Sequence, residues 1–175
     1  MKTELESALA SEFPFMKRSQ TLREQKEQGC IFDLYGAFGC DCGDGWFEVL
    51  KNLSIEITAA YEENNTPVDL VVDQVKEKFG TLRFYFHRKG QDPGIQAFDC
   101  LGGPSIRFAS GRSEFDRRIS EIVWKWEKLS GEVCERCGKT GRLRKNLPWV
   151  QTLCASCYCD TKKQYALRGK ILEEE

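Results

Sequence analysis

The 175-residue sequence lacks several patterns that define common classes of protein. It contains no uninterrupted apolar run near the ~20 residues that cross a bilayer, and its first residues show no basic segment followed by an apolar one. No glycine-rich phosphate-binding loop of the required spacing occurs. We therefore expect a cytoplasmic protein with no membrane association and no nucleotide-binding loop of that type.

Histidine is almost absent, because His87 is the only one. A histidine-dependent catalytic triad would depend on this one residue, which falls in a predicted strand and shares a face with Arg83 and Tyr85. We expect this face to meet solvent, so the preferred interpretation of His87 is an exposed residue of a sheet.

The composition is that of a folded protein, with 41% hydrophobic and 11% aromatic residues. A chain of this length can hold one ordinary domain, or one domain and a small metal module. It also contains nine cysteines. In a reducing compartment, cysteines serve as metal ligands and free thiols more often than as a disulfide framework.

Four of these cysteines form two C-x-x-C pairs separated by sixteen residues: Cys134, Cys137, Cys154 and Cys157. Two such pairs on a hairpin supply the four ligands of a tetrahedral Zn²⁺. The alternative is two pairs of ordinary thiols or disulfides. We prefer one Zn²⁺ in a zinc ribbon, because the spacing matches and the expected compartment is reducing. The site is structural, because four cysteine ligands leave no position for a catalytic water.

The net charge of −1 hides an uneven distribution. Residues 1–106 contain 11 Lys and Arg against 17 Asp and Glu, whereas residues 107–170 contain 15 against 7. A basic half built around a zinc ribbon is compatible with nucleic-acid binding, with binding to an acidic protein, or with attraction between the two halves. The candidate nucleic-acid contacts are Arg136, Lys139, Arg142, Arg144, Lys145 and Trp149, the last able to stack on a base.

The pattern of apolar residues predicts an α+β fold, in which a small antiparallel hairpin packs against amphipathic helices and a C-terminal zinc ribbon follows. We expect helices over residues 3–13, 44–63 and 113–130, with Asp44 and Ser113 as N-caps. Strands are expected over residues 68–76 and 81–88, joined by a turn at 77–80. Residues 30–39 are expected to form a strand and a turn. Trp46, Trp126, Phe84 and Phe86 are predicted core residues.

Two regions follow from this pattern. Residues 1–112 form the α+β core, with an irregular insertion at residues 89–112, and residues 113–175 form a helix, the zinc ribbon and a tail. The insertion combines glycine with apolar residues, so it is a candidate partner-binding segment. Its candidate contacts are Phe98, Ile106, Arg107 and Phe108.

A second cysteine-containing stretch, Gly39 to Trp46, places Cys40, Cys42 and Asp44 close together in the chain. One interpretation is an enzyme centre or second metal site at a helix N-terminus. The other is a buried glycine-rich turn in which small cysteines fill space. We prefer the turn, because C-x-C without a spaced partner is weak evidence for a metal.

Three segments together resemble a known group of proteins: Gly43-Asp-Gly-Trp-Phe47, Gln74-Val-Lys-Glu-Lys-Phe-Gly-Thr-Leu-Arg-Phe-Tyr85, and Cys134-Glu-Arg-Cys-Gly138. The chain resembles an uncharacterised family of small zinc-ribbon-containing proteins from phages, prophages and bacterial genomes. The resemblance implies a phage setting in the bacterial cytosol and a compact zinc fold, and it implies no activity.

The expected function is therefore that of a non-enzymatic zinc-binding interaction protein. Its partner would be a host protein complex, such as a defence system, that it modulates or inhibits. The alternatives are a nucleic-acid-binding zinc-ribbon module and an enzyme centred on Cys40, Cys42 and Asp44.

Overall fold

The computed structural model describes residues 1–18, 33–90, 97–98, 106–107 and 113–167, and the fold is α+β with a small mixed sheet. At its centre is a hairpin of β2 (Leu70–Lys78) and β3 (Thr81–Arg88). The turn between them consists of Phe79 and Gly80, both with positive φ. The predicted hairpin is confirmed, with its ends shifted by about two residues.

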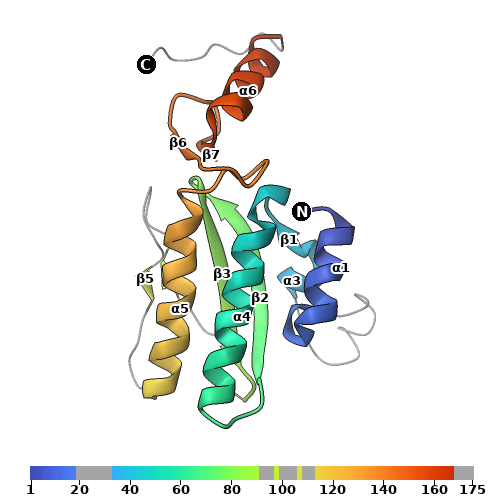
Figure 1. The fold of residues 1–175 in the computed structure, drawn as a ribbon, viewed down its shortest axis with the longest axis vertical. Coiled ribbons are helices and arrows are strands. Elements are labelled where there is room, and N and C mark those ends of the chain that lie inside the picture. The colour runs from blue at the N-terminus through green and yellow to red at the C-terminus, as the bar shows by residue number, and fades with distance from the viewer. Residues whose placement is uncertain (19–32, 91–96, 99–105, 108–112, 168–175) are drawn as a thin grey trace.

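Two long helices cover one face of this hairpin (Figure 1). They are α4 (Phe47–Glu63) and α5 (Glu114–Ser130), which lie side by side in opposite directions. The predicted cap of α5 is confirmed, because Ser113 and Asp116 form a capping box. The prediction that Asp44 is the N-cap of the helix now labelled α4 is wrong. The Asp44 carboxylate instead accepts a hydrogen bond from the backbone N–H of Lys2, at 2.8 Å.

The core lies between the hairpin and these two helices. Trp46 and Phe84 are fully buried and Phe86 is 6% exposed, as predicted. Trp126 is only partly buried, because it lies where α5 meets α4 and its indole N–H donates to Glu56 at 2.6 Å. The buried face of α5 is therefore centred on Ile119 and its neighbours rather than on Trp126.

Side chains of α5 also bind the outer edge of β3, the last strand of the sheet order β1-β2-β3. The backbone N–H of Leu82 donates to the hydroxyl of Ser130, and that of Phe84 donates to the carboxylate of Glu127, at 2.8 and 2.9 Å. Helix α5 therefore contacts both α4 and β3, so it covers the core and also binds the edge strand of the sheet.

An N-terminal group of short elements covers the other edge of the sheet. It comprises α1 (Thr3–Glu12), η1 (Pro14–Met16) and α3 (Leu34–Phe38). The strand β1 (Cys40–Asp41) then pairs in parallel with β2. The prediction of a strand just before Gly39 is wrong, because Asp33 caps a short helix there by accepting the N–H of Gly36 at 2.7 Å.

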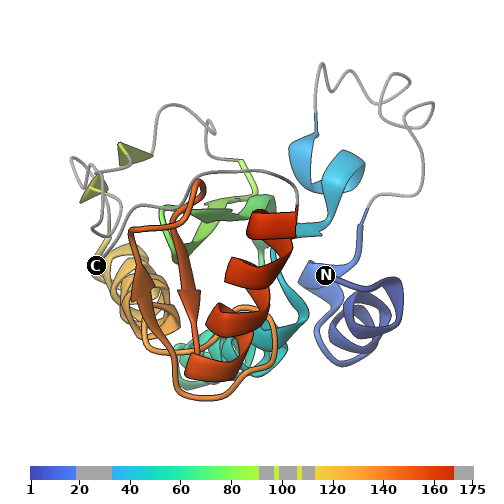
Figure 2. The same ribbon diagram turned by 90° about the horizontal axis from the view of Figure 1, so that it is seen from above.

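The ribbon lies at one end of the molecule, beyond the hairpin turn (Figure 1). Its strands are β6 (Arg142–Arg144) and β7 (Gln151–Leu153), followed by α6 (Ala155–Leu167), which the sequence analysis did not predict. Viewed along the long axis, these elements lie over the core helices and sheet (Figure 2). No helix within the described ranges combines the length and apolar character that a membrane span requires.

Of the predicted insertion, the structure describes two short paired strands, β4 (Ala97–Phe98) and β5 (Ile106–Arg107). Phe98 pairs with Ile106 along their backbones. Phe108 lies outside the described residues, so its proposed contact stays a prediction.

Candidate metal centre and its attachment to the core

The four predicted cysteine ligands converge at the base of the ribbon. The sulfur atoms of Cys134, Cys137, Cys154 and Cys157 all lie within 4.8 Å of one another. In a tetrahedral Zn–S₄ site with bonds of about 2.3 Å, sulfur atoms are separated by roughly 3.8 Å. The observed Cys137–Cys154 separation of 3.6 Å is close to this value, so the cluster has the dimensions and the soft donors of a metal site.

Local structure supplies these ligands from two different settings. Cys134 and Cys137 come from the knuckle that follows α5, whose turn is closed by a bond from the N–H of Gly138 to the carbonyl of Cys134 at 2.8 Å. Cys154 and Cys157 lie at the start of α6. There, N–H groups of the first helical turn have no partner within the helix, and that of Cys157 donates to the sulfur of Cys154 at 3.5 Å.

The electrostatics of the cluster favour a cation. Hydrogen bonds from the Ser156 hydroxyl and the Cys157 N–H lower the pKa of Cys154 to about 6, which prepares one thiolate. Burial and contacts with the neighbouring cysteines raise the pKa of Cys157 to about 12. Four neighbouring thiolates repel one another, and a bound metal ion would balance their charge.

The glycine-containing turn at residues 43–45 attaches the knuckle to the core. The N–H of Gly45 donates to the carbonyl of Glu135 at 2.7 Å, and the indole N–H of Trp46 donates to the carbonyl of Val133 at 2.8 Å. A Cβ at Gly45 would overlap the Cys134 carbonyl. The two separate motifs Gly43-Asp-Gly-Trp and Cys134-Glu-Arg-Cys therefore form a single contact.

The hairpin turn makes a second attachment. The Thr152 hydroxyl of β7 donates to the carbonyl of Gly80 at 2.6 Å, in a buried contact. The indole N–H of Trp149 donates to the carboxylate of Glu77 at 2.7 Å. Because each attachment includes a short hydrogen bond to a backbone carbonyl, of Glu135 or of Gly80, the ribbon is held against the core at two points.

The structure distributes the candidate nucleic-acid contacts unevenly. Arg136, Lys139, Arg142 and Lys145 are exposed, although Arg136 donates to Thr161 at 3.2 Å. Arg144 is only 6% exposed, because its guanidinium lies over the Tyr158 ring at 4.2 Å. Arg144 is thus a packing residue of the ribbon.

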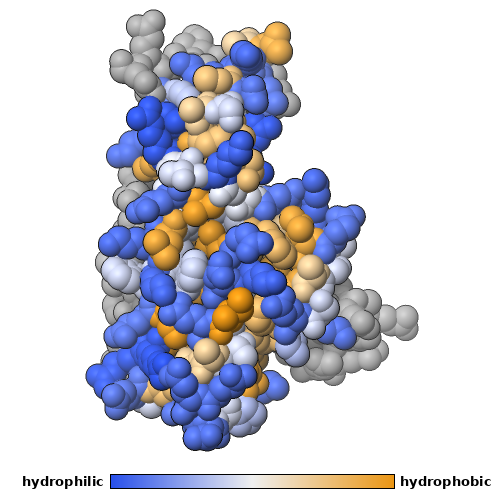
Figure 3. Space-filling view, in the orientation of Figure 1, coloured by the Kyte–Doolittle hydropathy of each residue, from blue (hydrophilic) through white to orange (hydrophobic). Residues whose placement is uncertain are grey.

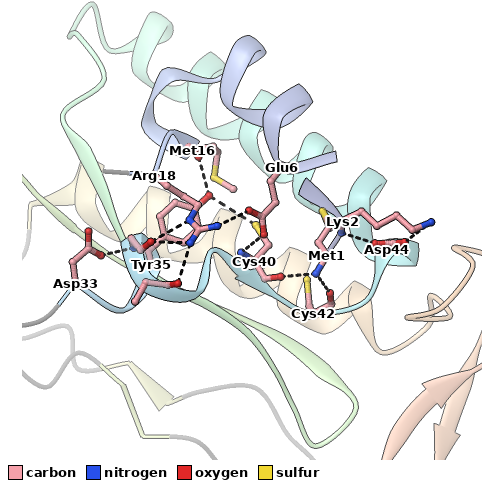
Figure 4. Close-up of polar contacts among 12 residues, drawn as sticks. Met1, Lys2, Glu6, Met16, Arg18, Asp33, Tyr35, Cys40, Cys42 and Asp44 are labelled. Atoms are coloured by element: carbon pink, nitrogen blue, oxygen red, sulfur yellow. Dashed lines mark hydrogen bonds and ion pairs between the residues drawn. The ribbon is translucent and has the colours of Figure 1, made fainter. Parts of the chain in front are cut away.

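The stretch containing Cys40 and Cys42 lies within the N-terminal group of elements (Figure 4). Glu6 accepts the N–H of Cys40 at 2.8 Å, and the amino group of Met1 donates to the carbonyls of both cysteines. Both thiols are buried. Burial raises the pKa of Cys40 to about 12 and that of Cys42 well above its ordinary value. Neutral buried thiols are poor nucleophiles, which supports a packing role.

The only histidine has a partner that sequence reasoning did not identify. His87 Nδ1 lies 2.7 Å from the carboxylate of Asp73 on the neighbouring strand, and its side chain is only 18% exposed. The bulge between Val72 and Gln74 shifts the register at this position, and no sequence pattern revealed that shift.

Comparisons of the chain with protein-family models, with curated proteins and with solved structures found no match. The functional conclusions therefore depend on the chain's own residues.

Proposed function

We propose that the chain is a non-enzymatic zinc-binding interaction protein, in which a structural Zn²⁺ fixes the ribbon and the ribbon presents a binding surface to a partner protein. Two observations support the non-enzymatic part. The metal cluster has cysteine at all four positions, and the thiols of Cys40 and Cys42 are buried with raised pKa values.

The observation that carries the proposal is the exposure of Trp149. This residue of the loop between β6 and β7 is 58% exposed, while its indole N–H is already bonded to Glu77. A bonded indole is held in one position and offers its apolar ring to a partner at little entropic cost. Tryptophan is also among the residues that contribute most to binding at protein interfaces.

The face formed by α4 and α5 is a less suitable surface. Its lower end is mainly hydrophilic, and apolar residues lie among hydrophilic ones in its middle and upper parts (Figure 3). Its exposed apolar side chains include Ile55 and Trp124, at 45% and 43%. Charged side chains also bridge the two helices on this face, as Lys125 does with Glu56 at 2.7 Å.

The setting implied by the resemblance belongs to the same proposal. In that setting the chain is a phage or prophage product that acts in the bacterial cytoplasm, and its partner is a host complex such as a defence system. The alternative of nucleic-acid binding is supported by four exposed cations on and near the ribbon.

A single experiment separates the two classes. The zinc-loaded chain is used as bait in bacterial lysate, with and without nuclease, beside a Trp149→Ala variant and a Trp124→Ala control. We expect a defined protein complex that survives nuclease and moderate salt, is lost with Trp149→Ala and is kept with Trp124→Ala. Binding to generic DNA or RNA that falls steeply with salt, and is lost on Arg142→Glu with Lys145→Glu, would instead establish the nucleic-acid class.

A further inference from the structure

A cleft of about 380 Å³ separates the knuckle from α6. Its lining includes Glu135 and Arg136 of the knuckle, Gln151 of β7, and Gln164 and Tyr165 of α6. Gly43, from the turn that attaches the ribbon, also lines it. The cleft thus lies where the core, the metal-binding knuckle and the last helix meet.

Glu135 is the unusual residue of this lining, because it is a carboxylate that is only 8% exposed. Its Oε1 accepts the N–H of Gly43 at 3.1 Å. Its Oε2 is buried and has no hydrogen-bond partner among the described residues. A buried carboxylate oxygen without a donor is unfavourable, so its position beside a cleft suggests that a ligand supplies the donor.

The surrounding charges specify the sign of that ligand. Glu77 and Asp41 add negative charge near the Glu135 carboxyl, and the Met1 amino group offsets part of it. The only cation of the lining is Arg136, whose Nη1 donates to Thr161 at 3.2 Å. A positively charged donor is therefore favoured next to Glu135, and an anion is disfavoured.

The remaining polar groups favour a planar cation with several donors. The side-chain amides of Gln151 and Gln164 each contain a carbonyl oxygen that can accept a hydrogen bond, and Tyr165 supplies an aromatic ring. A guanidinium carries five N–H donors in one plane and stacks on aromatic faces. An ammonium is a compact charge that would use fewer of these groups.

From this arrangement we infer that the cleft binds a guanidinium group, that of an arginine side chain on the partner protein. The inference rests on the proposed function, since it names one anchor of the same interaction. The arginine would donate to Glu135 Oε2 and to the carbonyl oxygens of the glutamine amides.

The test uses the full zinc-loaded chain and three small probes. These are Nα-acetyl-arginine amide, its neutral isostere Nα-acetyl-citrulline amide, and Nα-acetyl-lysine amide. We expect the arginine probe to shift the NMR resonances of the Gly43 backbone amide and the Gln164 side-chain amide saturably. The citrulline and lysine probes should bind at least about tenfold more weakly, because they lack the charge or the fork of donors.

Two variants test the assignment to the cleft. Glu135→Gln should weaken the arginine probe by at least about tenfold while zinc content stays at one per chain. Because Glu135 adjoins a metal ligand, Gln164→Lys provides an independent test. This variant places a cation in the cleft from the exposed side of α6, so it should also weaken the binding of the arginine probe. Lys163→Gln, outside the lining, is the matched control and should leave the affinity unchanged.

Equal binding of the arginine and citrulline probes, or no saturable shift at Gly43, would overturn the inference. Equal binding of the lysine probe would overturn the assignment to arginine. If the chain forms a partner complex that depends on Trp149 but binds none of the three probes, the proposed function is supported and only the arginine-binding cleft is contradicted.

Discussion

At the scale of single residues, Trp46 connects two parts of the molecule that are about ninety positions apart in the sequence. Its ring is fully buried in the core, and its indole N–H donates to the carbonyl of Val133 just before the knuckle. One side chain therefore contributes both apolar burial and a long-range hydrogen bond.

Replacing Trp46 with alanine should lower the free energy of unfolding by about 3–5 kcal/mol, because it leaves a large cavity and an unbonded carbonyl. Urea unfolding followed by far-UV circular dichroism measures the change. Trp124→Ala, at a side chain that is 43% exposed, is the control and should cost under about 1 kcal/mol. Similar losses in the two variants would contradict the assigned core.

Arg88, the last residue of β3, is the centre of a polar network. It binds Asp69 and Asp116 at 2.8 and 3.0 Å, and its guanidinium lies 5.3 Å from the centre of the Phe115 ring. The hydrogen bonds from Arg88 lower the pKa of Asp69 below its ordinary 3.8. A lowered folded-state pKa stabilises the fold above the unfolded value, and that stability is lost as the pH falls through the folded value.

The Asp69→Asn variant should therefore be less stable than the parent chain at neutral pH. The two proteins should converge in stability as the pH falls from about 3.8, the unfolded-state value, through the lower pKa that Asp69 has in the folded parent chain. Urea midpoints measured across this range test the expectation. Asp160→Asn, on the exposed side of α6, should follow the parent chain at every pH. A constant difference between Asp69→Asn and the parent would assign the effect to packing instead.

At the scale of elements, the contact between the glycine turn and the knuckle depends on the absence of side chains. Gly45 has an ordinary φ, so a larger residue there meets a steric obstacle rather than backbone strain. This feature lets the two segments approach closely enough for backbone hydrogen bonds.

We expect Gly45→Ala to destabilise the chain by about 1–3 kcal/mol through overpacking against Cys134. Thermal unfolding monitored by tryptophan fluorescence gives the measurement. Gly131→Ala is the control, because its Cβ would meet its nearest neighbours at 3.3 Å and its φ of −67° suits any residue. An unchanged melting temperature for Gly45→Ala would show that the turn and the knuckle are not in contact.

The ribbon is the element that should depend on metal. Structural zinc supplies on the order of 10 kcal/mol of binding free energy to small modules of this kind. Elemental analysis should find one zinc per chain, and Cys154→Ser should lose the metal and unfold at least the ribbon. Cys159→Ser, at an exposed thiol outside the cluster, should keep both metal and stability. Retention of zinc in Cys154→Ser would contradict the ligand assignment.

Most of the elements that the sequence predicted have long amphipathic repeats, and the ten-residue helix α1 is the short exception. Helices α4 and α5 and the central hairpin each present enough apolar residues on one face to reveal their period. The short helix α3 was missed because its five residues span little more than one turn. Helix α6 was missed because its two buried residues, Tyr158 and Thr161, form no apolar stripe.

At the scale of the whole molecule, the two attachments make the ribbon and the core one packing unit. The four metal ligands were predictable because C-x-x-C spacing is local information. The attachments were not, since the turn at Gly43 and the knuckle at Glu135 meet only in the folded chain, as do the residues of the cleft. Burial of Arg144 likewise depends on Tyr158 from a later helix.

We expect ribbon and core to unfold together, in one cooperative transition. Far-UV circular dichroism, tryptophan fluorescence and zinc release to a chromogenic chelator should give coincident melting curves. Weakening the attachment with Thr152→Val should shift all three curves together, whereas Thr140→Val, at an exposed threonine, should shift none. Zinc release well below the transition of the core would show that the two parts unfold independently.

The capped edge of β3 has a consequence for how copies of this chain behave in a crowded solution. An uncapped edge strand offers a row of amides to any extended segment, and it is a common starting point for fibres. Here Ser130 and Glu127 already take the amides of Leu82 and Phe84. A second molecule would have to displace helix α5 before its own strand could extend the sheet, so this edge resists polymerisation for as long as the helix stays folded.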